Sequence, residues 1–339
     1  MMANVNQYHA TPSPVCLAVV AIGRNEGIRL QACLTSALAA GIATVVVYVD
    51  SGSSDSSVSL AQALGCSVVN LDLCTPFTAA RARNEGFARA LQLQPGLTHV
   101  QFVDGDCELV DGWLQTAMAI LQANPDVAAA CGRRRERFPK RSIYNQLCDV
   151  EWNTSVGLTK SCGGDVLMRA QALQAAGGYR NSLIAGEEPE LCVRLRVAGW
   201  CIWRLDQDMT LHDAAILHFG QWWRRSKRAG HAFAEGAALH GAPPERHWVR
   251  ETRRAVFWGA VVPASAILGA ILIHPALISL ILLWPLQVLR LGWAWRGEGR
   301  VGREAALIWL PAKLAEAQGA IGFWIGRLRG RRRGLIEYK

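Results

Sequence analysis

The chain has 339 residues, 51% of them hydrophobic, with 13 tryptophans and a formal net charge of +9. A chain of this length forms one large domain or two, and its apolar excess indicates a part that associates with a membrane. The basic excess lies in residues 221–254 and 290–339, on either side of an uncharged apolar block. This arrangement is typical of membrane flanks and argues against nucleic acid as a partner.

The 10 cysteines are scattered between Cys16 and Cys201 without a CxxC pair. This pattern argues against a zinc or disulfide framework and indicates a reduced, cytosolic setting. Residues 1–14 are polar and lack the apolar core of a secretory signal. We therefore interpret them as a flexible N-terminal tail.

Strands and helices are predicted to alternate in the first part of the chain. Compact apolar or β-branched runs predict strands at residues 15–22, 44–50, 67–71 and 99–104, and helical patterns fall in residues 30–38, 61–64 and 77–93. This alternation predicts an α/β fold with a mostly parallel, doubly wound sheet, whose chemistry lies beyond the carboxyl ends of the strands. Asp50 and Asp104 fall at two of these ends.

The uncharged block, residues 255–289, is predicted to be a transmembrane helical hairpin. A single helix of this length would span about 52 Å, well beyond a hydrocarbon core of about 30 Å. The pair His274-Pro275 stands near the middle and is suited to a turn. Both ends would then lie on the basic, cytoplasmic side, with residues 237–254 as a basic linker. A buried pair of soluble helices is the alternative.

Residues 290–339 are predicted to form a basic third membrane helix or an interfacial helix, followed by a cytoplasmic tail. Their apolar stretch, residues 304–326, is interrupted by Lys313 and Glu316, which favours a helix that lies in the interface. The sequence RLRGRRRG after it is suited to anionic lipid head groups.

The sequence FVDGD ends a predicted strand with two carboxylates. Residues two apart in a strand face the same side, so Asp104 and Asp106 can converge on one point. Their hard oxygens suit Mg²⁺ or Mn²⁺, which commonly bridge substrate phosphates and would neutralise a departing diphosphate. A solvated turn is the alternative for an isolated DxD pattern.

Two further stretches carry polar candidates. In VDSGSSD, Asp50 precedes a small, flexible loop that can pass close to a nucleotide, where Asp50 could accept a hydrogen bond from a base or ribose. In ARARNEG, Arg81 and Asn84 share one helix face. An ordinary solvated helix is the alternative for the second stretch.

These motifs occur in the order and spacing of family 2 glycosyltransferases, which the chain resembles over residues 15–236. They are VVAIGRNEG, VDSGSSD, ARARNEG, FVDGDCEL, CGGDVLMRAQALQAAGGY and AGEEPELCVRLRVAGW. The resemblance implies the GT-A fold, a nucleotide-diphosphate sugar donor, a divalent metal and inversion at the anomeric centre. It also implies that Asp50 contacts the nucleotide, Asp106 binds the metal, and Asp104 faces the ribose or metal-bound water. Gly164, in the CGGD motif, would lie on the acceptor side.

The sequence AGEEPEL matches the place where the family carries a Glu-Asp pair, whose second acid is usually the general base. Glu188 holds that position here, one methylene longer than the usual Asp, with Glu187 beside it. Inversion needs in-line attack by an acceptor hydroxyl and a carboxylate that takes its proton. Crowding of Glu187, Glu188 and Glu190 should raise at least one pKa. An acid-rich helix N-terminus is the alternative.

The stretch QWWRR resembles the Gln-x-x-Arg-Trp motif of processive members of the family. Gln221 and Arg224 match, but Arg225 replaces the Trp that supports a growing glycan, which argues against a processive polymerase. Trp222 could offer a sugar-stacking face and Arg224 could reach the diphosphate, with a membrane-surface helix as the alternative. His212, just before this stretch, is either a third metal ligand or a structural histidine.

Together these features predict a membrane-anchored glycosyltransferase at the inner (cytoplasmic) membrane, with its catalytic domain facing the cytoplasm. It would move one sugar from a nucleotide-diphosphate sugar to an acceptor hydroxyl, and the anchor suggests that the acceptor is lipid-linked. Two alternatives remain open: a sugar-nucleotide nucleotidyltransferase, and a non-catalytic membrane scaffold with a nucleotide-sugar pocket. No local motif encodes the sugar, the nucleotide or the linkage.

Overall fold

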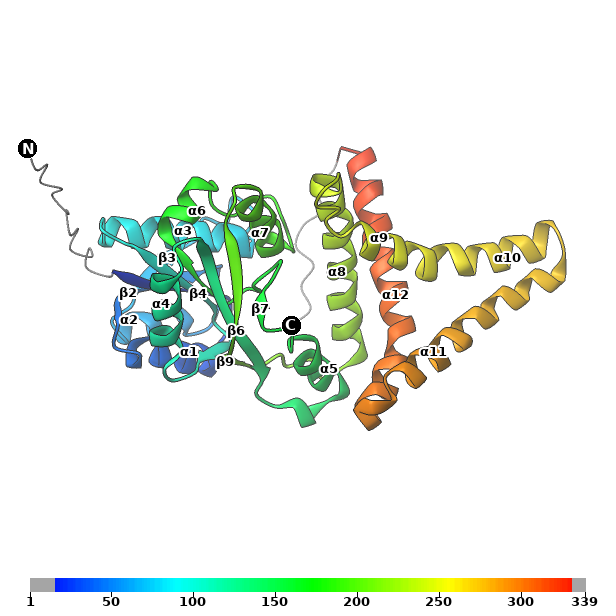
Figure 1. Ribbon diagram of the computed structural model, residues 1–339, viewed down its shortest axis with the longest axis horizontal. Coiled ribbons are helices and arrows are strands. Elements are labelled where there is room, and N and C mark those ends of the chain that lie inside the picture. Colours follow the sequence, from blue (N-terminus) through cyan, green and yellow to red (C-terminus); the bar gives the residue numbers. More distant parts are fainter. Residues whose placement is uncertain (1–15, 331–339) are drawn as a thin grey trace, which may run out of the picture.

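The structure, a computed structural model, describes residues 16–330. The tail predicted at residues 1–14 and the final residues of the predicted C-terminal tail lie outside this range. A β-sheet covered by helices forms one part of the molecule, and a helical part with a projecting hairpin forms the other (Figure 1).

Nine strands form a single mixed sheet. They are β1 (Leu17–Gly23), β2 (Ala43–Asp50), β3 (Ser67–Asn70), β4 (His99–Asp104), β5 (Cys107–Leu109), β6 (Val127–Glu136), β7 (Gly157–Leu158), β8 (Val166–Arg169) and β9 (Cys201–His212). Their order is β3-β2-β1-β4-β8-β6-β9-β5, with β7 also paired to β9. The four strands predicted from the sequence make a parallel half, and β8 runs antiparallel to both β4 and β6. The predicted α/β fold is therefore confirmed, with a mixed sheet.

Helices cover the sheet and form the second part of the molecule. They are α1 (Ile28–Ala39), α2 (Ser57–Ala63), α3 (Ala79–Leu93), α4 (Trp113–Ala123), α5 (Ile143–Glu151), α6 (Ala170–Ala175), α7 (Glu187–Val197), α8 (Phe219–His240), α9 (Val249–Val256), α10 (Val262–Leu272), α11 (Leu283–Ala294) and α12 (Gly299–Leu328). Strand β1 lies in the core, and its apolar run is buried. Helix α1 packs with Leu30, Cys33, Leu34 and Ala37 buried, the spacing of one helix face.

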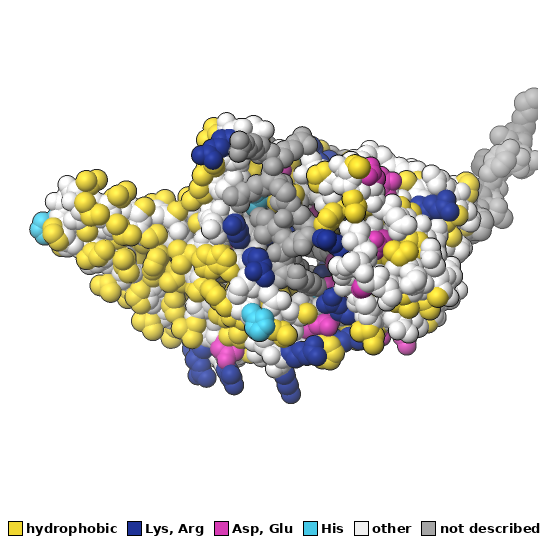
Figure 2. Space-filling view, turned by 180° about the vertical axis from the view of Figure 1, so that it is seen from behind, with side chains coloured by type: hydrophobic (Ala, Val, Ile, Leu, Met, Phe, Trp, Pro, Cys, Tyr) yellow, Lys and Arg dark blue, Asp and Glu magenta, His cyan; other side chains and the backbone are white. Residues whose placement is uncertain are grey.

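The hairpin projects from the rest of the molecule and reverses at His274 (Figure 1). Its arms, Val249–Leu272 and Pro275–Ala294, are the two helices within residues 16–330 that are long and apolar enough to cross a membrane. They extend beyond the predicted 255–289, because helix continues through the charged residues at both ends. Hydrophobic side chains cover the hairpin surface (Figure 2), and the most apolar windows of the arms are only 22% and 6% buried. A buried soluble helix pair does not fit such exposure.

Helix α12 packs along α8, which connects the hairpin to the rest of the chain (Figure 1). A Cβ atom added at Gly230 would lie 2.0 Å from the carbonyl oxygen of Glu316, and one at Gly319 would lie 2.0 Å from that of Lys227. Glycine at these positions lets the two backbones touch. The predicted linker, residues 237–254, instead holds the end of α8 and the start of α9.

Candidate active site

The carboxyl ends of β2 and β4 meet at one edge of the sheet. Strand β1 lies between them, with Gly23 paired to Asp50 and Ile22 paired to Asp104. A cleft of about 520 Å³ opens at this edge. Its charged lining comprises Arg24, Arg29, Arg83, Arg134, Arg225 and Arg228 with Glu26, Asp104, Asp106 and Glu187. Since six arginines face four acids, the cleft is suited to an anionic ligand with several phosphate oxygens.

Asp50 is buried and shapes the loop that borders the cleft. Its Oδ2 accepts hydrogen bonds from the backbone N–H groups of Gly52 and Ser53, at 2.9 and 2.8 Å. Its Oδ1 accepts from the Tyr48 hydroxyl at 2.9 Å and from the Ser53 hydroxyl. Ser51, the next residue, lines the cleft. Asp50 therefore fixes the start of this loop, and its contact with a nucleotide stays a prediction.

A buried guanidinium joins the two acidic motifs of the sequence. Arg83, on α3, donates to Asp104 at 2.6 Å and to Glu187 at 2.7 Å. Arg134, on β6, pairs with Asp104 at 3.3 Å and with the fully buried Asp165 at 2.9 Å. Each carboxylate thus has a cationic partner, as buried charges require. The network holds Asp104 between two arginines at the floor of the cleft.

Gly164 lies directly against this network. A Cβ atom at Gly164 would stand 2.8 Å from Nη2 of Arg83, 3.0 Å from Oδ2 of Asp104 and 3.2 Å from Nη2 of Arg134. No side chain fits there without displacing an ion pair. Close packing therefore explains why glycine occupies position 164. The role of Gly164 on the acceptor side stays a prediction.

Two of the predicted metal ligands meet at the cleft. Strand β5 pairs with β9 so that Cys107 lies opposite His212, and Nε2 of His212 lies 3.2 Å from Oδ2 of Asp106. One ligand atom each from Asp106, Cys107 and His212 lies within 4.8 Å of the others, a grouping able to hold a metal ion. Burial raises the pKa of the Cys107 thiol well above its usual range, so this group stays neutral. A carboxylate and an imidazole then remain, a donor set suited to Mn²⁺.

The His212 ring packs against an aromatic neighbour. The indole of Trp152 meets it edge-on at 4.8 Å between ring centroids, and Oε2 of the buried Glu136 lies 3.8 Å from its Nδ1. That distance is too long for a hydrogen bond, and Nδ1 has no hydrogen-bond partner among residues 16–330. Asp104 also belongs to a possible ligand group, with Cys107 and Asp165, but the two arginines occupy its carboxylate.

The two acids at the start of α7 differ in their surroundings. Glu187 is buried, lines the cleft and is paired with Arg83. Glu188 is partly buried and is not among the residues that line the cleft. Burial, and then the negative charge of Glu187, raise the pKa of Glu188 to about 8. The predicted crowding effect is thus present at Glu188, which carries the properties of a proton acceptor near neutral pH.

Arg81 and Asn84 lie away from the cleft. Helix α3 begins after Thr78, whose hydroxyl accepts from the backbone N–H of Arg81. The Arg81 guanidinium donates to the carbonyls of Asp72 and Thr75 at 2.8 Å, while Asn84 donates to the carbonyl of Tyr179 at 2.7 Å. Both side chains therefore hold loops in place, and Arg83 is the residue of this motif that reaches the cleft.

The predicted residues of α8 take structural positions. The Gln221 side chain accepts from the backbone N–H groups of Leu217 and His218 at the start of α8. Trp222 is buried and stacks on Tyr144 at 5.6 Å. Arg224 is exposed and is not a lining residue, whereas Arg225 and Arg228 of the same helix line the cleft.

Several cleft residues escaped prediction from the sequence. They are Arg83, Arg134, Trp152, Arg225 and Arg228, and with them the buried Asp165 that pairs with Arg134. The phase of α3 relative to its N-cap Thr78 could have selected Arg83 over Arg81, because residues two apart lie on opposite helix sides. Arg134 and Asp165 carry no such signal, since their place depends on the pairing of β4, β8 and β6.

Comparison with known proteins supports this geometry. Residues 19–161 match the family described as Glycosyl transferase family 2. Among curated proteins, the succinoglycan biosynthesis protein ExoA of Rhizobium meliloti (strain 1021) is 27% identical over 240 residues, which is 69% of each chain. Among solved structures, the mannosyltransferase PcManGT from Pyrobaculum calidifontis, in complex with GDP-Man and Mn²⁺, aligns with a TM-score of 0.60 and 17% identity. That alignment covers 92% of this chain and 88% of the other.

The mixed sheet, the acidic motif at the end of β4 and these likenesses define a glycosyltransferase with the GT-A fold. Residues 19–161 of the chain are similar to glycosyltransferase family 2, and its C-terminal part carries two helices that are long and apolar enough to span a membrane.

Proposed function

We propose that the chain is an inverting, metal-assisted glycosyltransferase that moves one sugar from a nucleotide-diphosphate donor to the hydroxyl of a lipid-linked acceptor. The observation that carries this proposal is the approach of Asp106 and His212 to 3.2 Å in a cleft lined by six arginines. A carboxylate and an imidazole beside several guanidinium groups are suited to a divalent cation and a diphosphate together.

The residues of the cleft have separable roles. Asp106 and His212 would hold Mg²⁺ or Mn²⁺, which when bound stabilises negative charge on the leaving diphosphate. Arg225 and Arg228 enter the cleft from α8 and are assigned to the donor phosphates. The buried Arg83 pairs with Asp104 and Glu187 and fixes both side chains, so that the donor meets an ordered surface.

Glu188 is the proposed general base. In an inverting transfer the acceptor hydroxyl attacks the anomeric carbon in line, and its proton must leave as the new bond forms. Glu188 has the raised pKa that suits this step, and it directly follows Glu187, which lines the cleft. The acceptor must then enter from the side of α7.

The membrane assignment rests on the hairpin. Its two arms return the chain to the side from which it left, with Arg253 and Arg254 at one end and Arg290 and Arg296 at the other. Basic residues on both flanks favour the cytoplasmic side of the inner membrane for the catalytic domain. An acceptor with a lipid anchor would meet the cleft at this surface.

A Glu188→Gln variant tests the proposal. It should bind the nucleotide-sugar in Mn²⁺ as the wild type does, measured by thermal shift, and should lose sugar transfer by about a hundredfold or more. Asp111→Asn, a change at an exposed acid outside the cleft, is the control and should keep full activity. Transfer by Glu188→Gln at the wild-type rate would remove Glu188 from the reaction.

A further inference from the structure

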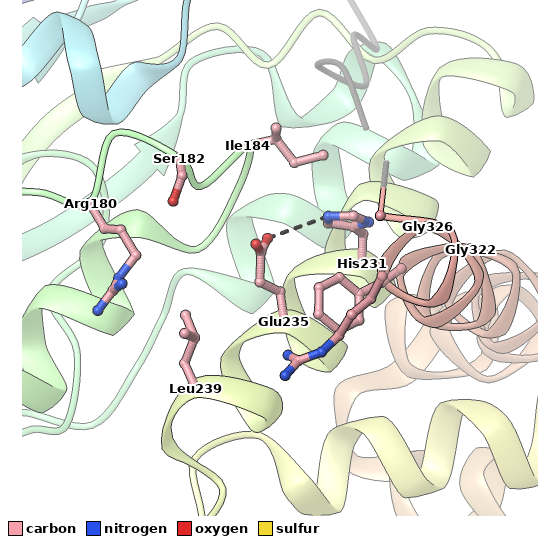
Figure 3. Close-up of a pocket in the computed structure, with 11 residues that line it drawn as sticks. Arg180, Ser182, Ile184, His231, Glu235, Leu239, Gly322 and Gly326 are labelled. Atoms are coloured by element: carbon pink, nitrogen blue, oxygen red, sulfur yellow. Dashed lines mark ion pairs between the residues drawn. The ribbon is translucent and has the colours of Figure 1, made fainter. Parts of the chain in front are cut away.

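A second cavity, of about 440 Å³, lies between the loop at residues 180–184, α8 and α12 (Figure 3). Its polar lining comprises Arg180, Ser182, His231, Glu235 and Arg327, and its apolar lining comprises Ile184, Leu239 and Phe323. Cavities of this size, apolar with a few convergent polar groups and placed between two parts of a protein, are typical ligand sites. None of these residues belongs to the catalytic cleft.

The cavity follows the catalytic cleft along one helix. Arg225 and Arg228 of α8 line the cleft, and Glu235 and Leu239 line the cavity. Their spacings of three, seven and four residues place all four on one face of α8. The rise from Arg228 to Glu235 is about 10 Å, so one ligand can reach both sites.

The loop that forms the opposite wall also connects the two sites. Thr78, which lines the cleft, donates through its hydroxyl to the carbonyl of Asn181 at 3.0 Å. Arg180 and Ser182, the neighbours of Asn181, line the cavity. The same loop runs on to Glu187 at the start of α7. The loop that precedes Glu187 therefore contacts a residue of the cleft and also lines the cavity.

The cavity offers donors to an anion. Arg180 uses Nε to bind Glu190 at 3.2 Å, and its side chain is 43% exposed, so its terminal nitrogens face solvent at the wall. Arg327 stands over the ring of Trp324 at 5.7 Å. His231 is buried, with Nε2 3.4 Å from Oε2 of Glu235, as Figure 3 shows.

The Nδ1 atom of His231 is buried without a hydrogen-bond partner among residues 16–330. A buried polar nitrogen without a partner is costly, and a bound polar group would satisfy it. The single acid in the lining, Glu235, is already opposite His231. Two guanidinium groups thus remain for a phosphate, which arginine recognises through its planar set of donors.

The apolar lining adjoins further apolar side chains at the C-terminal end of α12. Ile184, Leu239 and Phe323 form the walls, and beyond them α12 exposes Trp324, Ile325 and Leu328, with Leu328 85% exposed. Exposed apolar side chains in this number mark a surface that meets lipid or a partner. An anion site beside an apolar path is suited to a molecule with a phosphate and a hydrocarbon chain.

We propose that this cavity binds the phosphate or diphosphate of a lipid-linked acceptor, with the lipid chain along Phe323 and Leu239 and the acceptor sugar reaching the cleft past Glu188. The inference rests on the proposed function and names the part of the chain that selects the acceptor class. The two ligands then have separate sites. The cleft binds the donor, and the cavity binds the phosphate of the acceptor.

The test is a binding titration by calorimetry, using the full chain in neutral detergent and four probes. Farnesyl diphosphate carries both the anion and the chain, inorganic diphosphate only the anion, and farnesol only the chain. Phosphatidylglycerol represents an ordinary anionic lipid. Farnesyl diphosphate should bind most tightly. Equal affinity for inorganic diphosphate, or for phosphatidylglycerol, would overturn the proposal.

Arginine variants locate the site. Arg180→Gln and Arg327→Gln should each weaken farnesyl diphosphate binding by about tenfold. Arg303→Gln, at an exposed arginine on the same helix α12 and outside the cavity, is the matched control and should leave binding unchanged. If both cavity variants bind like the wild type, the anion lies elsewhere and the proposal is wrong.

Donor binding distinguishes this inference from the proposed function. Nucleotide-sugar binding in Mn²⁺ should be unchanged in Arg327→Gln, while the KM for a lipid-linked acceptor rises and kcat changes little. Absence of farnesyl diphosphate binding in the wild type, with donor binding intact, would overturn only the acceptor cavity. Absence of donor binding in the wild type would instead sink the proposed function.

Discussion

Nε2 of His212 lies 3.2 Å from Oδ2 of Asp106, although the two residues come from distant parts of the chain. The antiparallel pairing of β5 with β9 sets Cys107 opposite His212 and so brings the imidazole to the acid. Trp152 meets the imidazole edge-on, and a carboxylate oxygen of Glu136 lies 3.8 Å from its Nδ1. Strand pairing therefore brings the two proposed metal ligands together.

Removing either ligand should weaken metal binding. Asp106→Asn and His212→Asn are each expected to lower Mn²⁺ affinity by about tenfold to a hundredfold, because each removes one direct ligand from a small donor set. Loss of the free Mn²⁺ signal in electron paramagnetic resonance measures this affinity. Asp111→Asn, outside the cleft, should bind Mn²⁺ like the wild type. Wild-type affinity in both ligand variants would mean that the cation binds elsewhere.

The pH dependence of transfer should report Glu188. Its pKa is raised to about 8, by burial and by Glu187, and a general base acts only when ionised. The rate should therefore rise with pH and level off above about 8. Glu187→Gln removes the neighbouring negative charge, so the midpoint should move to lower pH. A midpoint that stays in place or moves upward in Glu187→Gln would contradict the assignment.

Gly164 should tolerate no side chain. A Cβ atom there would stand 2.8 Å from Arg83 and 3.0 Å from Asp104, so Gly164→Ala must displace the ion pair between them. We expect a loss of about 1–3 kcal/mol in stability and a weaker binding of the donor, measured by thermal unfolding with and without nucleotide-sugar. Gly96→Ala, where the added atom meets nothing within 4 Å, is the matched control. Similar unfolding of the two variants would show that the ion pair can move aside.

Substitution of Arg228 and of Arg224 in α8 should have different effects on the KM for the donor. Arg228 lines the cleft, whereas Arg224, one helical turn away, is exposed and outside it. Arg228→Gln should raise the KM for the donor by about tenfold, because it removes a charge-assisted contact to phosphate. Arg224→Gln should leave the KM unchanged. A raised KM in Arg224→Gln and an unchanged KM in Arg228→Gln would instead support the sequence-based assignment of Arg224 to the diphosphate.

The sequence predicts the parallel strands well, because buried strands are uninterrupted apolar runs and their ends are marked by Asp50 and Asp104. It also predicts the reversal at His274, while the role of Asp106 and His212 as metal ligands stays a prediction. It does not predict Arg134 and Asp165, because their meeting depends on strand pairing across distant segments. In the same way, Arg81 has suitable chemistry, but its helix phase turns it away from the cleft, and Arg224 is exposed and does not line the cleft.

The ends of the hairpin helices could not be predicted from the apolar pattern. The uncharged block marks where lipid-facing residues begin and end, yet the helices continue past it on both sides. Charge ends an apolar pattern without ending a helix, since arginine is a good helix former. Likewise, nothing in the sequence of α12 shows that it packs on α8, where Gly230 and Gly319 allow close contact.

The central claim is transfer of a sugar from a nucleotide-diphosphate donor with Glu188 as base. Its most direct test incubates the purified full chain with labelled nucleotide-sugars, Mn²⁺ and a membrane lipid extract, and follows both products. We predict Mn²⁺-dependent release of nucleoside diphosphate, matched by labelled lipid, and loss of both in Glu188→Gln. Release of inorganic diphosphate instead, or equal labelling by Glu188→Gln, would contradict it.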